Sequence, residues 1–141
     1  MKVKYPIVNY SDKIIGHRNK DRAYKERAML RSVQIFVYNS KGELYIQKRS
    51  KNKLRYPCYF CASVAGHVEP GESYREAAVR ELKEELGTEC DLTYIDTFPG
   101  IASWKDKSFP IISHAFLASL HSEIVFNKEE NTMRLLIERG K

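Results

Sequence analysis

At 141 residues and 16.4 kDa, the chain has room for a single hydrophobic core but not for two. Hydrophobic residues make up 43% of it, charged residues 30%, and the net charge is +6, which is typical of a globular protein and excludes a largely disordered chain. No run of about eighteen apolar residues occurs, and no apolar block opens the chain, which argues against a membrane span or a secretion signal. We therefore expect one domain, residues 1–141, in the cytoplasm.

The positive charge is unevenly distributed along the chain. Residues 1–60 carry fifteen Lys and Arg against four Asp and Glu, whereas residues 61–141 carry nine against fourteen. A basic half beside an acidic half suits a site that takes an anionic ligand through a bound cation. Nucleic-acid binding is the alternative that the net charge permits, but no recognised nucleic-acid-binding motif supports it.

The first half of the chain predicts strands and turns. Residues 5–28 indicate an edge strand and a turn, followed by a polar connector. Residues 29–38 and 43–49 are separated by the turn sequence NSKG and predict a β-hairpin, with one apolar face formed by Val33, Ile35 and Val37. Residues 50–66 begin too rich in basic and turn residues for a regular strand. They predict a loop that leads into a short strand.

The three cysteines of the chain are Cys58, Cys61 and Cys90. An odd number without a secretion signal favours free thiols in a reducing compartment. Cys58 and Cys61 form a CxxC pair, which with Cys90 and His67 is an alternative zinc site, but no second ligand pair supports it.

The pattern then changes to the period of a helix. Ser73 and Glu76 form a capping box, residues 74–86 contain neither Gly nor Pro, and Gly87 follows as a stop signal. An inward face is predicted at a spacing of four, by Ala78, Leu82 and Leu86.

Two further strands are predicted after this helix. Residues 92–98 and 110–120 are rich in β-branched and aromatic residues, and a loop containing Pro99, Gly100 and Trp104 separates them. Strands before and after a long helix predict a mixed α/β domain.

The predicted helix carries an unusual stripe of acids. Glu81, Glu84 and Glu85 lie on one side, where their repulsion costs roughly 0.2–0.5 kcal/mol per pair. Arg80 can reach Glu84, but we expect it to point too far round the helix to neutralise Glu81. The alternative, a charged solvent face, does not explain the glycine-bearing loop at residues 65–73. A bound Mg²⁺, which prefers oxygen ligands, explains both features.

Fixed residues recur at defined spacing between residues 66 and 88. Gly66 is followed after five residues by Glu72, and seven residues later comes the run RELKEELG at 80–87. This arrangement resembles the Nudix box, the signature of the Nudix hydrolases. The last position, usually aliphatic, is Thr88, which a helix-to-strand boundary tolerates. Eight matching positions in a loop–helix context make the resemblance specific.

The resemblance implies an α/β/α sandwich around a mixed β-sheet and an attack of water on a diphosphate linkage that depends on Mg²⁺ or Mn²⁺. It implies that the metal is held by Glu81, Glu84, Glu85 and the carbonyl of Gly66. It assigns catalytic roles to Glu84, Glu85 and Arg80, of which Arg80 orients a glutamate through a salt bridge. Glu72 supports the loop, and Gly87 ends the helix.

Residues 10–130 also resemble the Nudix branch related to isopentenyl-diphosphate isomerase, which moves a double bond by protonating and deprotonating carbon. Aligned on Gly66, the catalytic cysteine of the isomerase falls at Ala65, and Cys61 lies four positions too early to replace it. Its metal-binding histidines and its downstream glutamates fall near Ala23, Leu30, Phe109 and Ile111. These side chains cannot shuttle protons, so the sequence favours hydrolysis, with an isomerase-like enzyme as the alternative.

The substrate is predicted less sharply. Candidate phosphate contacts are Lys48, Arg49, Lys53, Arg55 and His67. Aromatic residues that could stack a base, or belong to the core, are Tyr56, Tyr59, Phe60, Trp104 and Phe109. We expect a nucleoside diphosphate linked to another moiety. The general base is predicted to be Glu84 or Glu85, with downstream alternatives at Glu123, Glu129 and Glu130.

Two expectations concern alternatives to a complete enzyme. A Nudix-fold module that binds a diphosphate compound or a protein without cleavage is possible, but it would not need three mutually repelling glutamates. The C-terminal region is short for the family, since the last segment, residues 129–141, has no room for a further helix. Either that region is reduced or a second subunit completes the packing, as in a homodimer.

Overall fold

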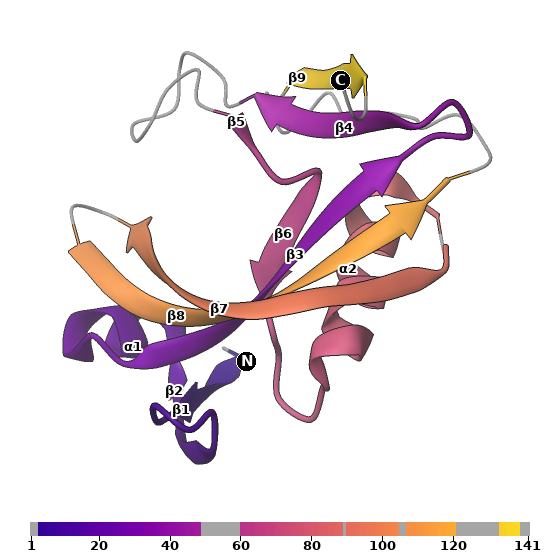
Figure 1. The fold of residues 1–141 in the computed structure, drawn as a ribbon. Helices are drawn as coiled ribbons and strands as arrows, with labels where there is room; N and C mark the ends of the chain where they lie inside the picture. Colours follow the sequence, from indigo (N-terminus) through magenta and orange to yellow (C-terminus); the bar gives the residue numbers. More distant parts are fainter. Residues whose placement is uncertain (1–2, 49–59, 89, 105–106, 121–132, 139–141) are drawn as a thin grey trace.

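The computed structural model describes residues 3–48, 60–88, 90–104, 107–120 and 133–138. They form a mixed sheet and two helices (Figure 1). In chain order the elements are β1 Lys4–Val8, β2 Ile14–Asn19, α1 Lys20–Glu26, β3 Met29–Tyr38, β4 Glu43–Lys48, β5 Phe60–Cys61, β6 Val64–His67, α2 Tyr74–Leu86, β7 Leu92–Trp104, β8 Lys107–Ser119 and β9 Met133–Glu138. Neither of these helices has the length and apolar character that crossing a membrane requires.

Strand β3 is the centre of the sheet. Along one edge it pairs in parallel with β8, from Leu30 opposite Ile111 to Tyr38 opposite Ser119. Along the other edge it meets three antiparallel partners in turn, β1, β6 and β4. Strand β8 continues the sheet through antiparallel β7, and β4 pairs with β5 and β9. The predicted α/β fold with a mixed sheet is therefore confirmed.

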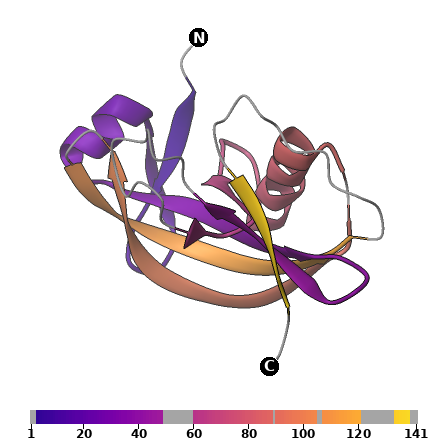
Figure 2. The ribbon, with the colours of Figure 1, turned by 90° about the horizontal axis from the view of Figure 1, so that it is seen from above.

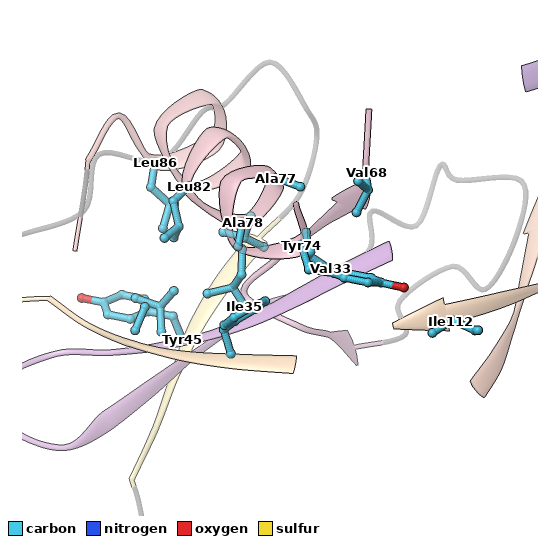
Figure 3. Packing of buried hydrophobic residues seen from close by; sticks show 14 of the residues in the cluster. Val33, Ile35, Tyr45, Val68, Tyr74, Ala77, Ala78, Leu82, Leu86 and Ile112 are labelled. Atoms are coloured by element: carbon cyan, nitrogen blue, oxygen red, sulfur yellow. The ribbon is translucent and has the colours of Figure 1, made fainter. Parts of the chain in front are cut away.

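The main core forms where α2 packs on β3. The predicted inward face of α2 is confirmed, since Ala78 and Leu82 are fully buried and Leu86 nearly so. Figure 3 shows these side chains directed toward the sheet, where Val33 and Ile35 of β3 are also fully buried. Each large apolar side chain buried in this way stabilises the fold by about 1.5–3 kcal/mol. The contact fixes the height and rotation of α2 relative to β6.

Both predicted ends of α2 are confirmed. The Ser73 hydroxyl accepts from the Glu76 amide at 3.1 Å, and the Glu76 carboxylate accepts from the Ser73 amide at 3.0 Å. At the other end Gly87 adopts φ +67 and its amide donates to the Lys83 carbonyl at 2.9 Å. Glycine adopts this left-handed backbone conformation at little cost, so the helix ends there. The caps thereby set which face the glutamates occupy.

The prediction of a polar connector at the end of residues 5–28 is wrong. Strand β1 turns back through Asp12 into a second strand, β2, and residues 20–26 form helix α1. Asn19 caps α1 by accepting from the Arg22 amide at 2.9 Å. The alternation in β2 is weak because most of its residues are half-buried or exposed. Helix α1 is too short to show a helical period clearly.

The predicted loop between residues 98 and 110 is also wrong. Strand β7 runs on through Pro99 and Gly100 to Trp104, and β8 begins at Lys107. Among the described residues β7 pairs only with β8, so it is an edge strand there. Proline is tolerated on an edge, because the missing N–H faces away from the ladder.

The N-terminal strands β1 and β2 extend the sheet from β3, and helix α1 follows them at the opposite end from α2. Figure 2 shows α1 and α2 toward opposite ends of the curved β7–β8 pair. Beneath α1 a second apolar cluster is formed by Ile7, Ala23, Tyr24, Leu30, Phe109 and Ile111. Strand β6 pairs with β3 and contributes Val64 to the main core, and its last residues, Gly66 and His67, line the cavity with residues of α2 and β1.

Candidate functional site

A cavity of about 290 Å³ lies where β6, α2 and the N-terminal elements meet. It is lined by Tyr5, Lys20, Gly66, His67, Glu69, Arg80, Glu81 and Glu84. A larger hollow of about 420 Å³ lies between β1, β2 and α1, but its one carboxylate, Glu26, is paired with Arg18 and Arg22. We place the candidate site in the smaller cavity because two of the predicted carboxylates, Glu81 and Glu84, line it.

Arg80 forms ion pairs with four carboxylates at or next to this cavity. Its guanidinium lies 2.8 Å from Glu69, 2.6 Å from Glu72, 2.9 Å from Glu81 and 3.2 Å from Glu84, nitrogen to oxygen in each pair. We call these five residues the carboxylate wall. The expectation that Arg80 cannot reach Glu81 is wrong, because its long side chain bends back across the start of the helix. One cation among four carboxylates still leaves an excess of negative charge.

Arg80 also ties the helix to the loop before it. Its Nη2 donates to the carbonyl of His67 at 3.0 Å, and it donates two bonds to Glu72. Glu72 in turn accepts from the Glu69 amide at 2.8 Å. The predicted supporting role of Glu72 therefore has a geometric basis, since one carboxylate joins the loop backbone to the helix.

Two of the carboxylates paired with Arg80, Glu72 and Glu81, differ in the direction of their pKa shifts. Burial alone would raise the pKa of Glu72, but hydrogen bonds from Arg80 and from the Glu69 amide, with the charge of Arg80, bring it below its usual value. Burial raises the pKa of Glu81, and Arg80 offsets this only in part. Glu81 thus lies where a carboxylate charge is poorly stabilised by the protein alone.

Gly66 packs directly against Glu81. A Cβ placed on Gly66 would lie 2.1 Å from Oε1 and 2.3 Å from Cδ of Glu81, closer than any real contact. The position therefore requires glycine for space rather than for an unusual backbone angle. The close approach puts the β6 backbone beside a carboxylate, as expected if both serve one ligand.

A ring cluster reaches the cavity through Tyr5 and His67, and we call it the aromatic wall. It consists of Tyr5, Tyr24, His67 and Phe109. Tyr24 and Phe109 stack with ring centroids 4.0 Å apart, and the Tyr24 hydroxyl lies 3.1 Å from Nε2 of His67. Burial and the nearby charge of Lys20 lower the pKa of His67 to about 4. His67 is therefore neutral near pH 7.

The remaining predicted site residues are not among the described residues that line the cavity. Glu85 lies on α2 with one carboxylate oxygen buried, and it is not among the cavity-lining residues. Lys48 ends β4, and its side chain is not described. Several candidates lie outside the described residues, namely Arg49, Lys53, Arg55, Tyr56, Cys58, Tyr59, Glu123, Glu129 and Glu130.

Three cavity-lining residues were missed at the level of sequence. Glu69 lies within the loop at 65–73, where its acidic character was a usable signal. Tyr5 and Lys20 come from β1 and α1, far from the box in sequence, and no local pattern distinguishes them. Only the pairing of β1 with β3 brings them to the cavity.

Comparison with known proteins decides the family. The NUDIX domain model matches residues 29–136. The chain belongs to the Nudix family. An uncharacterized Nudix hydrolase of Nostoc sp. is 41% identical over 92 residues, which cover 64% of this chain and 53% of that protein. An isopentenyl-diphosphate Delta-isomerase 2 of Photorhabdus laumondii is 30% identical over 125 residues, 88% of this chain and 71% of that protein.

The solved Nudix-like structures agree with this assignment. The crystal structure of DR0079 from Deinococcus radiodurans superposes with a TM-score of 0.73 at 26% identity, covering 96% of this chain and 83% of that one. The predicted Nudix-like fold is confirmed. The chain spans about half the length of the Nostoc relative.

Proposed function

We propose that this Nudix protein is a pyrophosphohydrolase, which cleaves a diphosphate linkage by attack of water with the help of a divalent metal. The observation that carries the proposal is the convergence of three carboxylates, Glu69, Glu81 and Glu84, and their shared Arg80 on a single cavity that Gly66 also lines. An excess of carboxylate oxygens suits Mg²⁺ or Mn²⁺.

The residues present fit such a metal by their chemistry. Gly66 leaves no room for a side chain beside Glu81, and the two residues line the same cavity. No three His, Cys, Asp or Glu side chains of the described residues already stand in ligand geometry, because Glu81 and Glu84 turn toward Arg80. We propose that the metal is held by Glu81, Glu84, Glu85 and the Gly66 carbonyl.

When bound, Mg²⁺ or Mn²⁺ neutralises diphosphate oxygens and lowers the pKa of water. The protein then supplies position and a proton acceptor. We propose that Glu84 or Glu85 takes the proton of the attacking water, because both belong to the acidic stripe of α2. Arg80 holds Glu72 and Glu81 in place, so its catalytic contribution acts through these carboxylates.

Isomerisation is the alternative, since isomerases are among the relatives. Four positions that the resemblance assigns to metal ligands or acids of the isomerase are apolar here, and they meet in the second cluster: Ala23, Leu30, Phe109 and Ile111. All four are buried. A packed apolar cluster cannot bind a metal or exchange protons with carbon, which supports hydrolysis.

We propose that the substrate is a nucleoside diphosphate linked to another moiety and that Mg²⁺ is the usual metal. We propose cytoplasmic action, a small-molecule partner rather than nucleic acid, and one Nudix domain over residues 1–141 with its box at 66–88. We propose that the substrate is contacted by Lys48, Arg49, Arg55 and His67. Because His67 is neutral, it would act as a hydrogen-bonding group rather than as a cation. A homodimer stays a prediction.

The test is a release assay for phosphate and pyrophosphate in Mg²⁺ or Mn²⁺. It is run across nucleoside triphosphates, nucleotide sugars, dinucleotides and prenyl diphosphates. We expect turnover of at least one class, and a loss of about a hundredfold or more with Glu84→Gln. If the wild type released neither phosphate nor pyrophosphate from any substrate class, or if Glu84→Gln kept full activity, the proposal would be contradicted. Conversion of isopentenyl diphosphate to its isomer without phosphate release would favour the alternative.

A further inference from the structure

Part of the cavity is built by residues that precede the family match at 29–136. Tyr5 of β1 and Lys20 of α1 line the cavity together with Glu69, Glu81 and Glu84. The same two residues also line an adjoining hollow of about 200 Å³, with Val3, Asn19 and Asp21. Tyr5 and Lys20 therefore stand at the boundary between the carboxylates and a second space.

Lys20 brings a cation to this boundary. Among the residues that the structure describes, it forms no ion pair, whereas Arg80 is shared by four carboxylates. Its Nζ lies 5.7 Å from the centre of the Tyr24 ring, within the range of a cation–π contact. The aromatic wall thus holds an ammonium group at the cavity without neutralising it.

Tyr5 brings a hydrogen-bond donor to the same place. Its ring packs edge-on against His67, with centroids 5.9 Å apart. Burial, together with the negative charges of Glu69, Glu81 and Glu84, raises the pKa of its hydroxyl. The phenol therefore keeps its proton and can donate to an anion. The Tyr5 O–H beside this carboxylate cluster and the Lys20 ammonium over the Tyr24 ring form a pair of donors on the N-terminal side.

We propose that Lys20 and Tyr5 are substrate-binding residues, which donate hydrogen bonds to the diphosphate group from the N-terminal side of the cavity. The remainder of the substrate would enter the adjoining hollow that both residues share. Charge-assisted bonds from an ammonium to phosphate oxygens are among the stronger polar contacts. This inference rests on the proposed function, since it assumes a diphosphate in the cavity.

Binding is tested without turnover, by calorimetric titration of methylenediphosphonate in millimolar Mg²⁺. We expect Lys20→Met to weaken the Kd about tenfold or more, and Tyr5→Phe about threefold to tenfold. Lys20→Arg should keep the Kd within about threefold of the wild-type value. Matched controls are Lys4→Met, next to Tyr5 but exposed, and Tyr10→Phe, whose side chain is 93% exposed. Neither control should change the Kd.

Unchanged affinity in Lys20→Met, or absence of probe binding by the wild type, would overturn the inference. A folding defect is separated from a binding defect by the thermal midpoint, and Lys20→Gln serves if Lys20→Met fails to fold. Once a substrate is known, Lys20→Met should raise KM more than it lowers kcat, whereas Glu84→Gln should lower kcat. Equal kinetics for Lys20→Met and wild type would sink the inference and leave the proposed function standing.

Discussion

The carboxylate wall and the aromatic wall border the same cavity, yet they are built in different ways. The carboxylate wall comes from one stretch, residues 69–84, and is held by ion pairs around Arg80. The aromatic wall is gathered from β1, α1, β6 and β8 and is held by packing of neutral rings. One wall is local and charged, and the other is long-range and largely uncharged.

The difference separates two tasks. Groups that must hold a metal at fixed spacing gain from a single capped helix, whose geometry is set within a few residues. Groups that bind the substrate need only a stable surface, which distant segments can supply. We therefore expect changes in the carboxylate wall to affect catalysis and stability together, and changes in the aromatic wall to affect binding and pH response.

Removal of the Arg80 side chain should have the largest effect on stability and activity. Arg80→Ala leaves four carboxylates without their shared cation, so we expect the free energy of unfolding to fall by about 2–4 kcal/mol and activity to fall about a hundredfold or more. Urea denaturation and the release assay measure the two effects. Arg80→Lys keeps the positive charge but loses the planar guanidinium that bonds several carboxylates at once. Its stability and activity should therefore lie between those of the wild type and Arg80→Ala. Wild-type stability in Arg80→Ala would show that the wall does not depend on ion pairing.

Gly66→Ala should separate catalysis from stability. The added Cβ displaces the end of the Glu81 side chain, which can move, so we expect unfolding free energy to change by less than about 1 kcal/mol. Activity should fall about tenfold to a hundredfold, because a shift of this size misplaces a metal ligand. Gly16→Ala is the matched control, since its Cβ would meet Arg18 at an ordinary 3.5 Å. Equal activity of the two variants would contradict the role of the Gly66–Glu81 contact.

The aromatic wall should respond to pH. The pKa of His67 in the folded chain is about 4, below its ordinary value of 6.5, so folding favours the neutral ring. The stability that this provides is complete above about pH 6.5 and is lost as pH falls toward 4. Between about pH 7.5 and pH 5 the loss is about 2 kcal/mol. Urea denaturation of wild type and His67→Gln at both pH values measures it, and an identical pH dependence would refute it.

The smallest effect is expected at the helix start. Ser73→Ala removes the hydroxyl that caps α2, so unfolding free energy should fall by about 1 kcal/mol. Activity per folded molecule should stay close to wild type, because the cap supports the carboxylate wall without touching the cavity. Differential scanning calorimetry with the release assay gives both quantities. A tenfold loss of kcat at unchanged stability would mean that the cap has a direct role in catalysis.

The contrast between the walls also explains what could be read from the sequence. Helix α2 and its two caps follow from spacing within one segment, and they were predicted correctly. The hairpin of β3 and β4 was predicted for the same reason. The reach of Arg80 to Glu81 was not, because backbone angles on a helix say little about a long, flexible side chain.

The N-terminal side could not be predicted, because its residues become neighbours only through sheet pairing. Tyr5 reaches the cavity because Ile7 pairs with Leu30, and nothing in residues 1–28 encodes that register locally. The prediction ended this strand at residue 98, before Pro99, whereas β7 continues to Trp104. Proline is tolerated there because β7 is an edge strand, and an edge position is set by the pairing of the whole sheet.

The most direct test of the account is the thermal midpoint with and without about 10 mM Mg²⁺, at matched ionic strength. A ligand that binds only the folded chain raises the midpoint. We expect wild type and Lys20→Met to rise by about 2–6 °C, because the carboxylate wall is intact in both. Glu84→Gln combined with Glu85→Gln should rise by less than about 1 °C. An equal rise in all three proteins would contradict the claim that the glutamates of α2 hold the metal.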